Sequence, residues 1–184
     1  MKKLREIASR LACDTRGAEI AEAAAVLPLM FMVLLGIFWF GQAFSIYGAI
    51  TRAAQEGARA GSVPYCVTCA GNSTLAQMET NASSAVQNAL QSSRLNPTLA
   101  KYPAPSPALL SCGANPVPVA CDATASSNVC IQAPVQLTKG AGATNLCGVS
   151  VSLRYPFRFW LPFTSINNQT IWISASARVR RENQ

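Results

Sequence analysis

The feature that most constrains this chain is a long stretch without charged residues. No Asp, Glu, Lys or Arg occurs among the 29 residues from Ala23 to Thr51. Residues 26–40 alone hold ten Leu, Ile, Val or Phe side chains, which favour insertion into a bilayer by about 3 to 6 kcal/mol. About 20 apolar residues cross the hydrocarbon core as a helix. The sequence therefore predicts a transmembrane helix with its span at about residues 24–46.

A cleaved secretory signal peptide is the alternative interpretation of this stretch. Its apolar region normally has only about 7–15 residues before a small-residue cleavage site. Here the run is longer and contains the bulky residues Phe38, Trp39 and Phe40. The length favours a membrane anchor.

The helix is expected to run beyond the bilayer, to about residue 60. Pro28 is expected to bend it, because proline removes one backbone donor. Gly61 is a plausible C-cap. Three further glycines either mark places where another helix approaches closely or reflect the ordinary frequency of glycine in membrane helices: Gly36, Gly41 and Gly48.

The charges that flank the span predict its orientation. The leader, residues 1–17, contains five basic residues against Glu6 and Asp14, and these are Lys2, Lys3, Arg5, Arg10 and Arg16. Positive flanks stay in the cytoplasm, so residues after about 50 are expected outside the cell membrane. The outer basic residues are scattered and lie on the wrong side of the membrane for nucleic acid, so no nucleic-acid partner is expected.

The chain has seven cysteines and no histidine. Lacking histidine, it has no His-based catalytic triad and no His-ligated zinc or haem. Cys13 lies in the leader, and six cysteines lie on the expected outer side: Cys66, Cys69, Cys112, Cys121, Cys130 and Cys147. An even outer set indicates structural disulfides of unassigned pairing. For Cys66 and Cys69, a redox pair or half of a metal site are the alternatives; no metal or other cofactor is expected.

The junction before the span carries the most informative pattern, Arg16-Gly17 followed by Glu22 at the start of the apolar run. The simplest interpretation is an interfacial glutamate whose carboxylate reaches water. The pattern around it nevertheless resembles a type IV prepilin processing site. Residues 16–61 resemble the TadE-like family, the minor pseudopilins of tight-adherence (Flp-type) systems, in the Gly-Glu-Pro spacing and in the Ala- and Gly-rich stretch at 53–60. The ending ISASARVRRE is similar to that family as well.

The resemblance implies that a prepilin peptidase cuts after Gly17 and makes Ala18 the first residue. The new α-amino group has an ordinary pKa near 8. It lies four residues before Glu22, about 6 Å along a helix. The two charges could pair within one chain or between neighbours, because an unpaired charge in a low dielectric is costly. The expected partners are the bilayer, the peptidase, and other pilin subunits with their assembly machinery. The expected location is the inner membrane of a bacterium.

The outer part, residues 62–184, is expected to fold as a small α+β head. Apolar spacings of three and four predict a helix at 72–94 that Pro97 ends. Residues 95–128 are rich in Pro, Ser and Ala and predict a loop pinned by its cysteines. Alternation predicts antiparallel strands at 129–137, 146–155 and 170–180 with one apolar face on a helix; Pro134 marks the first as an edge strand. Residues 155–163 are expected to form a turn that either packs on the core or exposes an aromatic patch.

These observations favour a structural assembly protein over an enzyme. The few outer acids form no close pair, and no phosphate-binding loop or nucleophile elbow occurs; no catalytic residue is therefore predicted. Two alternatives remain: an anchored thiol–disulfide protein that uses Cys66 and Cys69, and an uncleaved anchored binding domain.

Overall fold

The computed structural model describes residues 15–62, 75–113, 115–121, 128–137, 146–158 and 170–181. The chain forms two compact units, Met1–Gln42 and Ala43–Gln184, of which the second is the head. The predicted α+β class is confirmed: a long N-terminal apolar helix precedes a second helix and a three-stranded antiparallel sheet.

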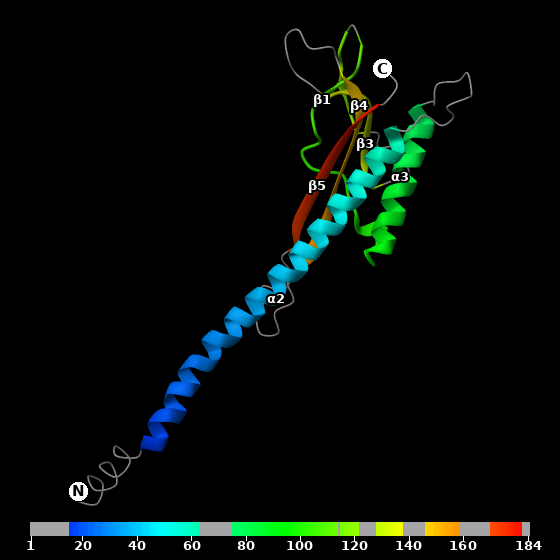
Figure 1. Ribbon diagram of the computed structural model, residues 1–184. Coiled ribbons are helices and arrows are strands. Elements are labelled where there is room, and N and C mark those ends of the chain that lie inside the picture. The colour runs from blue at the N-terminus through cyan, green and yellow to red at the C-terminus, as the bar shows by residue number, and fades with distance from the viewer. Residues whose placement is uncertain are drawn as a thin grey trace, which may run out of the picture. The chain divides into compact units, whose positions relative to one another are not determined.

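Helix α2 (Thr15–Ser62) is one continuous helix of 48 residues that includes Pro28 (Figure 1). Inside the head, its buried residues before the terminal Ser62 recur at intervals of three and four, and they are Ile50, Ala53, Ala54, Gly57, Ala58 and Gly61. This spacing gathers them on one face of the helix. All but one are Ala or Gly, so this face can approach its neighbours closely.

The prediction that Gly61 caps the helix is wrong, because α2 includes Gly61 and ends at Ser62. A Cβ atom on Gly61 would lie only 3.2 Å from the Ala82 side chain and 3.2 Å from the Val149 side chain. A Cβ atom on Gly57 would overlap the Val86 side chain. Both glycines therefore serve close packing of α2 against its neighbours rather than helix termination.

Helix α3 (Leu75–Ser92) presents the apolar face that the sequence predicts. Five of its residues are buried in the core: Met78, Ala82, Val86, Ala89 and Leu90. The expectations for residues 72–74 lie outside the described residues.

The end of α3 differs from the prediction that Pro97 terminates it. Arg94 has a φ of 59°, and its N–H donates to the Gln91 carbonyl at 2.9 Å. The Leu95 N–H donates to the Leu90 carbonyl at 2.9 Å. These two bonds define a Schellman motif with its left-handed residue at Arg94. Pro97 instead begins the short 3₁₀ helix η1 (Pro97–Leu99).

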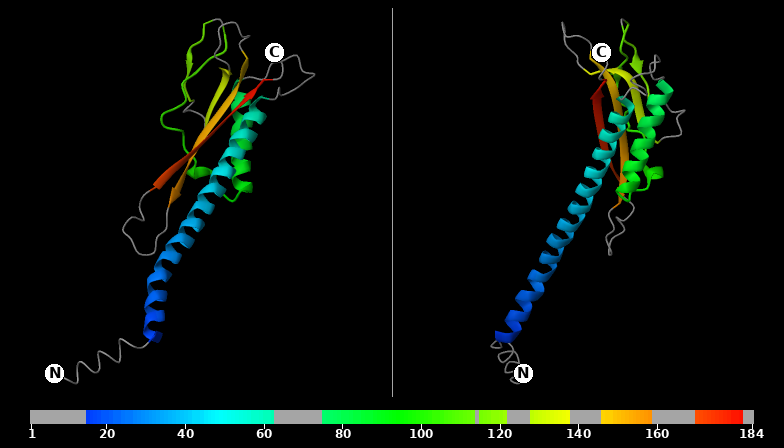
Figure 2. Two further views of the ribbon diagram at one scale, coloured as in Figure 1. Left: turned by 60° about the vertical axis from the view of Figure 1, so that its left-hand side comes forward. Right: turned by 45° about the vertical axis from the view of Figure 1, so that its right-hand side comes forward.

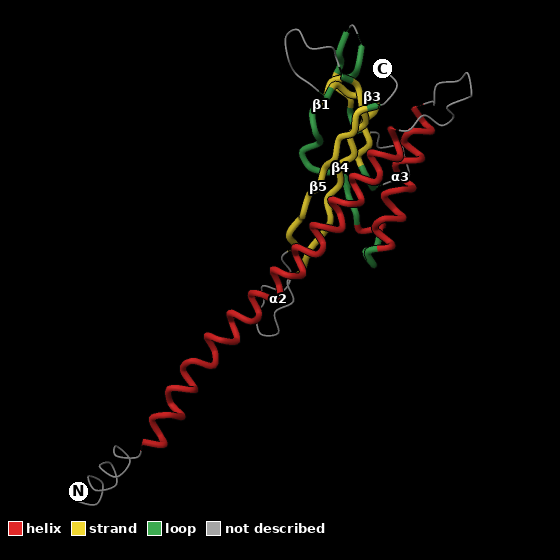
Figure 3. Tube along the Cα trace, viewed as in Figure 1, coloured by secondary structure: helices red, strands yellow, loops and turns green. Residues whose placement is uncertain are grey.

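The main sheet has the order β3-β4-β5 with antiparallel neighbours (Figure 3). Its strands are β3 (Cys130–Gln136), β4 (Cys147–Arg158) and β5 (Thr170–Arg180). Val151 pairs with Ala177 and Leu153 with Ala175, and these side chains belong to the core. Helix α3 and residues 43–62 of α2 cover one face of this sheet (Figure 2). Strand β3 is an edge strand, as Pro134 predicts, and its register shifts between Gln132 and Val135.

The opposite face of the sheet is buried too, at its centre, which the sequence did not predict. Ser150 and Ser152 of β4 are 1% and 2% exposed, although they alternate with the apolar residues. The Pro-rich segment covers this face. The Gln132 side-chain amide donates to the carbonyl of Pro107 at 3.0 Å and to that of Val119. The centre of strand β4 therefore lies between two layers, and its two serines are not solvated.

The Pro-rich segment 95–128, predicted as a loop, contains regular structure. Besides η1, it forms the antiparallel pair β1 (Leu109–Leu110) and β2 (Pro118–Val119). Two disulfides fix it to the sheet, Cys112–Cys147 and Cys121–Cys130. Lys101 and Arg154 exchange backbone hydrogen bonds of 2.9 Å. The prediction that cysteines hold the Pro-rich segment in place is confirmed for the four cysteines of these two disulfides.

We expect Gly57→Ala to lower the thermal unfolding midpoint of the full chain in detergent. The added methyl group overlaps Val86, and such overpacking lowers the free energy of unfolding by about 1–3 kcal/mol. The higher helix propensity of alanine offsets about 1 kcal/mol of this loss. Gly48→Ala is the matched control, because a Cβ atom there meets nothing within 4 Å. It should leave the midpoint unchanged or raise it. Equal behaviour of both variants would contradict the close packing at Gly57.

The two disulfides should contribute unequally to stability. They close separations of 35 and 9 residues, for which chain entropy gives about 4 and about 3 kcal/mol. Denaturant unfolding should therefore be easier for Cys112→Ala/Cys147→Ala than for Cys121→Ala/Cys130→Ala. Cys13→Ala serves as the control and should match the parent chain. The reverse order of the two double variants would show that strain or residual structure outweighs loop entropy.

Candidate functional site

The candidate processing site lies in the first turns of α2. The helix begins at Thr15, so Gly17 and Ala18 are already helical. Gly17 is exposed, and a Cβ atom built there meets nothing within 4 Å. The backbone around the predicted scissile bond is thus open on its surface, although it is helical in this structure.

Glu22 lies one turn further along the same helix and is exposed. Side chains of a helix tilt toward its N-terminus, so the Glu22 carboxylate extends back toward the turn that holds Ala18. Among the described residues, no basic group forms an ion pair with Glu22. Glu19, also exposed, stands on the same turn as Ala18. The site therefore combines two acids with a position where a new amine would appear.

From Ala23 to Phe40, α2 is apolar on all sides. Its large side chains from Ile20 to Phe40 are mostly exposed, and Met32 reaches 76%. The segment that starts at Glu19 is long and apolar enough to cross a membrane. A helix that is apolar all round is stable only inside a membrane or a protein core. This property indicates a membrane anchor.

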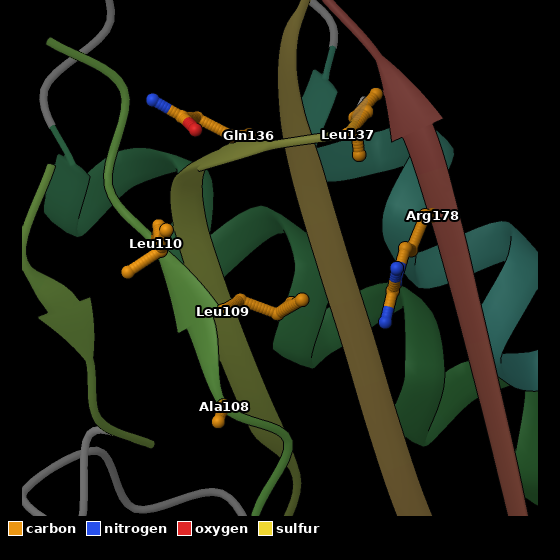
Figure 4. A pocket seen from close by; sticks show the side chains of 6 residues that line it. All are labelled: Ala108, Leu109, Leu110, Gln136, Leu137 and Arg178. Carbon is orange, nitrogen blue, oxygen red and sulfur yellow. The ribbon is translucent and has the colours of Figure 1, made fainter. Parts of the chain in front are cut away.

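A small hollow occurs on the head, close to the strand pair β1–β2 (Figure 4). Its volume is about 80 Å³, and its lining residues are Ala108, Leu109, Leu110, Gln136, Leu137 and Arg178. Ligand pockets usually have volumes of about 300–1,000 Å³. The hollow contains one charged side chain and no nucleophile, so its shape and chemistry do not describe a catalytic site.

The cysteines predicted as disulfide candidates separate into two groups. Four of them are joined in the two bonds of the Pro-rich segment. Cys66 and Cys69 lie outside the described residues. Within the described ranges, no group of three or more Cys, Asp or Glu residues could hold a metal ion.

The predicted aromatic turn at 155–163 is wrong in its first half. Residues 155–158 continue β4, and they pair with residues 170–173 of β5. Tyr155 and Phe157 point into the core at 5% and 4% exposure, because strand alternation continues past Pro156. Residues 159–163 lie outside the described part of the chain.

One interaction that sequence reasoning missed lies beside this region. The guanidinium carbon of Arg154 lies 4.6 Å from the centre of the Trp172 ring. Such cation–π contacts are favourable by about 0.5–2 kcal/mol. Both residues lie at the positions that alternate with the core-facing residues of their strands. This alternation could have indicated that the two side chains lie on the same face of the sheet. Their cross-strand proximity, however, depends on the register of β4 with β5, which the sequence did not supply.

These features define a class of protein: a chain with one apolar N-terminal helix, long enough to cross a membrane, joined to a small disulfide-linked α+β head. The model of the family described as TadE-like protein matches residues 17–59. This range includes Gly17, Glu22 and the small-residue face of α2 as far as Ala58, and it confirms the TadE-like resemblance in this part of the chain. Comparisons with curated proteins and with solved structures gave no match.

Proposed function

We propose that this chain is a minor pseudopilin-like membrane protein that takes part in the assembly of a tight-adherence (Flp-type) pilus. The observation that carries the proposal is the TadE-like match over residues 17–59. That segment places Gly17 and Glu22 at the start of a helix long enough to cross a membrane. The family suggests a role in Tad pilus-related systems, whose TadE-like proteins are structural rather than catalytic.

The proposed location is the inner membrane of a bacterium, with a single span. The basic leader of residues 1–17 remains cytoplasmic, because positive flanks are retained there. The head lies on the extracytoplasmic side. Its two disulfides support this side, since such bonds persist in oxidising compartments and are rare in the cytoplasm.

A prepilin peptidase is the proposed processing partner, with cleavage after Gly17. Cutting there would remove only three described residues of α2 and leave Ala18 as its first residue. The new ammonium group would then sit at the positive end of the helix dipole, which is unfavourable for a cation. A nearby carboxylate offsets this cost, and Glu22 is four residues away on the same side of the helix.

The pairing of Glu22 with an N-terminal amine is proposed to act between subunits. Two spans that pack side by side in lipid can align only where their charged groups meet, because an unpaired charge at this depth is costly. A carboxylate of one chain and an amine of its neighbour would therefore fix the axial register of the packed helices. The partners are other pilin or pseudopilin subunits and their assembly machinery.

The first test is N-terminal sequencing of the chain purified from the membrane fraction of cells that express the matching pilus system. We expect the sequence to begin at Ala18. A Gly17→Val variant should retain the leader, because the bulky side chain blocks the residue before the cut. An intact Met1 in the parent chain, in the presence of the peptidase, would exclude processing at Gly17.

The second test concerns Glu22. We expect Glu22→Gln to reduce cross-linking of the chain to neighbouring subunits in the membrane and to reduce pilus assembly, because the neutral amide cannot pair with an amine. Cleavage should be measured on the same samples, so that a processing defect is not mistaken for an assembly defect.

Glu19→Gln is the matched control for that experiment. It makes the same chemical change on the same exposed helix, three residues earlier. It should leave cross-linking near the parent level. If both variants behave alike, or if Glu22→Gln assembles normally, the proposed pairing is wrong.

A further inference from the structure

One end of the head exposes apolar and aromatic side chains next to a cation. This end is formed by the last residues of β4 and the first residues of β5, where Pro156 pairs with Trp172 and Phe157 with Ile171. Ile171 and Trp172 are 46% and 40% exposed. Arg158 is exposed on the adjoining pair. Large apolar side chains with this exposure are unusual elsewhere in the described part of the sheet.

Helix α2 contributes to the same end of the head. Ile46 and Ile50 join the core cluster that includes Tyr155 and Ile173, and Ile173 is two residues from Ile171. The β4–β5 end lies beside the part of α2 where the chain enters the head (Figures 1 and 2). Two aromatic side chains that flank Ile46 on α2, Phe44 and Tyr47, are exposed at 72% and 50%. We call Phe44, Tyr47, Arg158, Ile171 and Trp172 the proximal rim.

Trp172 is held in place rather than free to fold back on the sheet. The Arg154 guanidinium covers its ring at 4.6 Å, and the Nε atom of Arg154 is buried without a hydrogen-bond partner among the described residues. The arginine thus lies against the sheet surface, and its cation–π contact favours this orientation of the indole. A fixed, amphipathic ring with a wet edge and an apolar body is the type of side chain found at membrane–water interfaces.

We propose that the proximal rim rests in the lipid headgroup layer of the membrane that α2 crosses. This proposal depends on the membrane anchoring proposed above. The second unit begins at Ala43, so Phe44 and Tyr47 follow the first unit within a few residues, and chain connectivity keeps these two residues close to the bilayer surface. Trp and Tyr are enriched at that level, and Arg158 can bind lipid phosphates. The rim contains no acidic side chain that anionic headgroups would repel.

The opposite end of the head provides a natural comparison. There the β1–β2 pair lies near the disulfide Cys112–Cys147, at the start of β4 rather than at its end. Val117 is exposed at 59% beside β2. A reporter at this position should stay in water if the rim alone contacts lipid.

The test uses the full chain in nanodiscs of phosphatidylcholine and phosphatidylglycerol, with or without bromine atoms on the lipid chains near the glycerol. Three single-tryptophan variants are compared. Trp39→Phe/Trp160→Phe retains Trp172 as the rim reporter, and Trp160→Phe/Trp172→Phe retains Trp39 as the span reporter. Val117→Trp, with Trp39, Trp160 and Trp172 all changed to Phe, reports on the distal end.

We expect brominated lipid to cause a loss of fluorescence for Trp172 and for Trp39, but not for the tryptophan at position 117. Loss for Trp39 without loss for Trp172 would overturn the rim proposal and leave the membrane anchor intact. Absence of loss at Trp39 would instead contradict the anchor itself. Equal loss at positions 172 and 117 would also overturn the proposal, because lipid would then contact the head without preference for the rim.

A second measurement tests the contribution of the other sheet residues of the rim. Ile171→Ser/Arg158→Ser, added to the Trp39→Phe/Trp160→Phe variant that retains Trp172, should lower the quenching of Trp172 by brominated lipid. Circular dichroism and retention of both disulfides would establish that this variant is folded. Unchanged quenching in a folded variant would contradict the role of Ile171 and Arg158.

Discussion

The structure depends on one physical constraint: a helix that must satisfy two different surroundings along its length. Its first part is apolar on every side and is long enough to cross a membrane. Its second part has a narrow face of Ala and Gly that packs inside the head. The exposed apolar part of the helix gives way to the part that packs in the head near residue 43, where the second compact unit begins. Because one continuous helix passes through both surroundings, the head follows the apolar segment directly in the chain.

Both faces of the small sheet in the head are covered. Helices α2 and α3 cover one face, and close approach at Gly57 and Gly61 makes this layer thin. The Pro-rich segment covers the other face and has little regular hydrogen bonding of its own. Gln132 satisfies two of its carbonyls, and two disulfides hold it to the sheet.

Much of this arrangement could be predicted because the responsible signals are local. The uncharged stretch, the three-and-four spacing of α3 and the alternation of β5 each depend on neighbours in sequence. The predictions that failed concern contacts between distant segments. The local sequence predicts that Gly61 ends the helix. In the structure, however, the lack of a side chain at Gly61 allows α2 to pack closely against Ala82 and Val149. Residues 155–158 read as a turn because of Pro156, but pairing with β5 keeps them in a strand.

The candidate site divides in the same way. The sequence by itself determined the anchor, the Gly17 and Glu22 pattern and the family resemblance, because each depends on composition and spacing within one helix. Only the tertiary structure decided which cysteines are joined, that Ser150 and Ser152 are buried, and that Arg154 covers Trp172. These outcomes require the register of strands and the path of a long loop, and no local pattern encodes the three-dimensional proximity of residues that lie far apart in the chain.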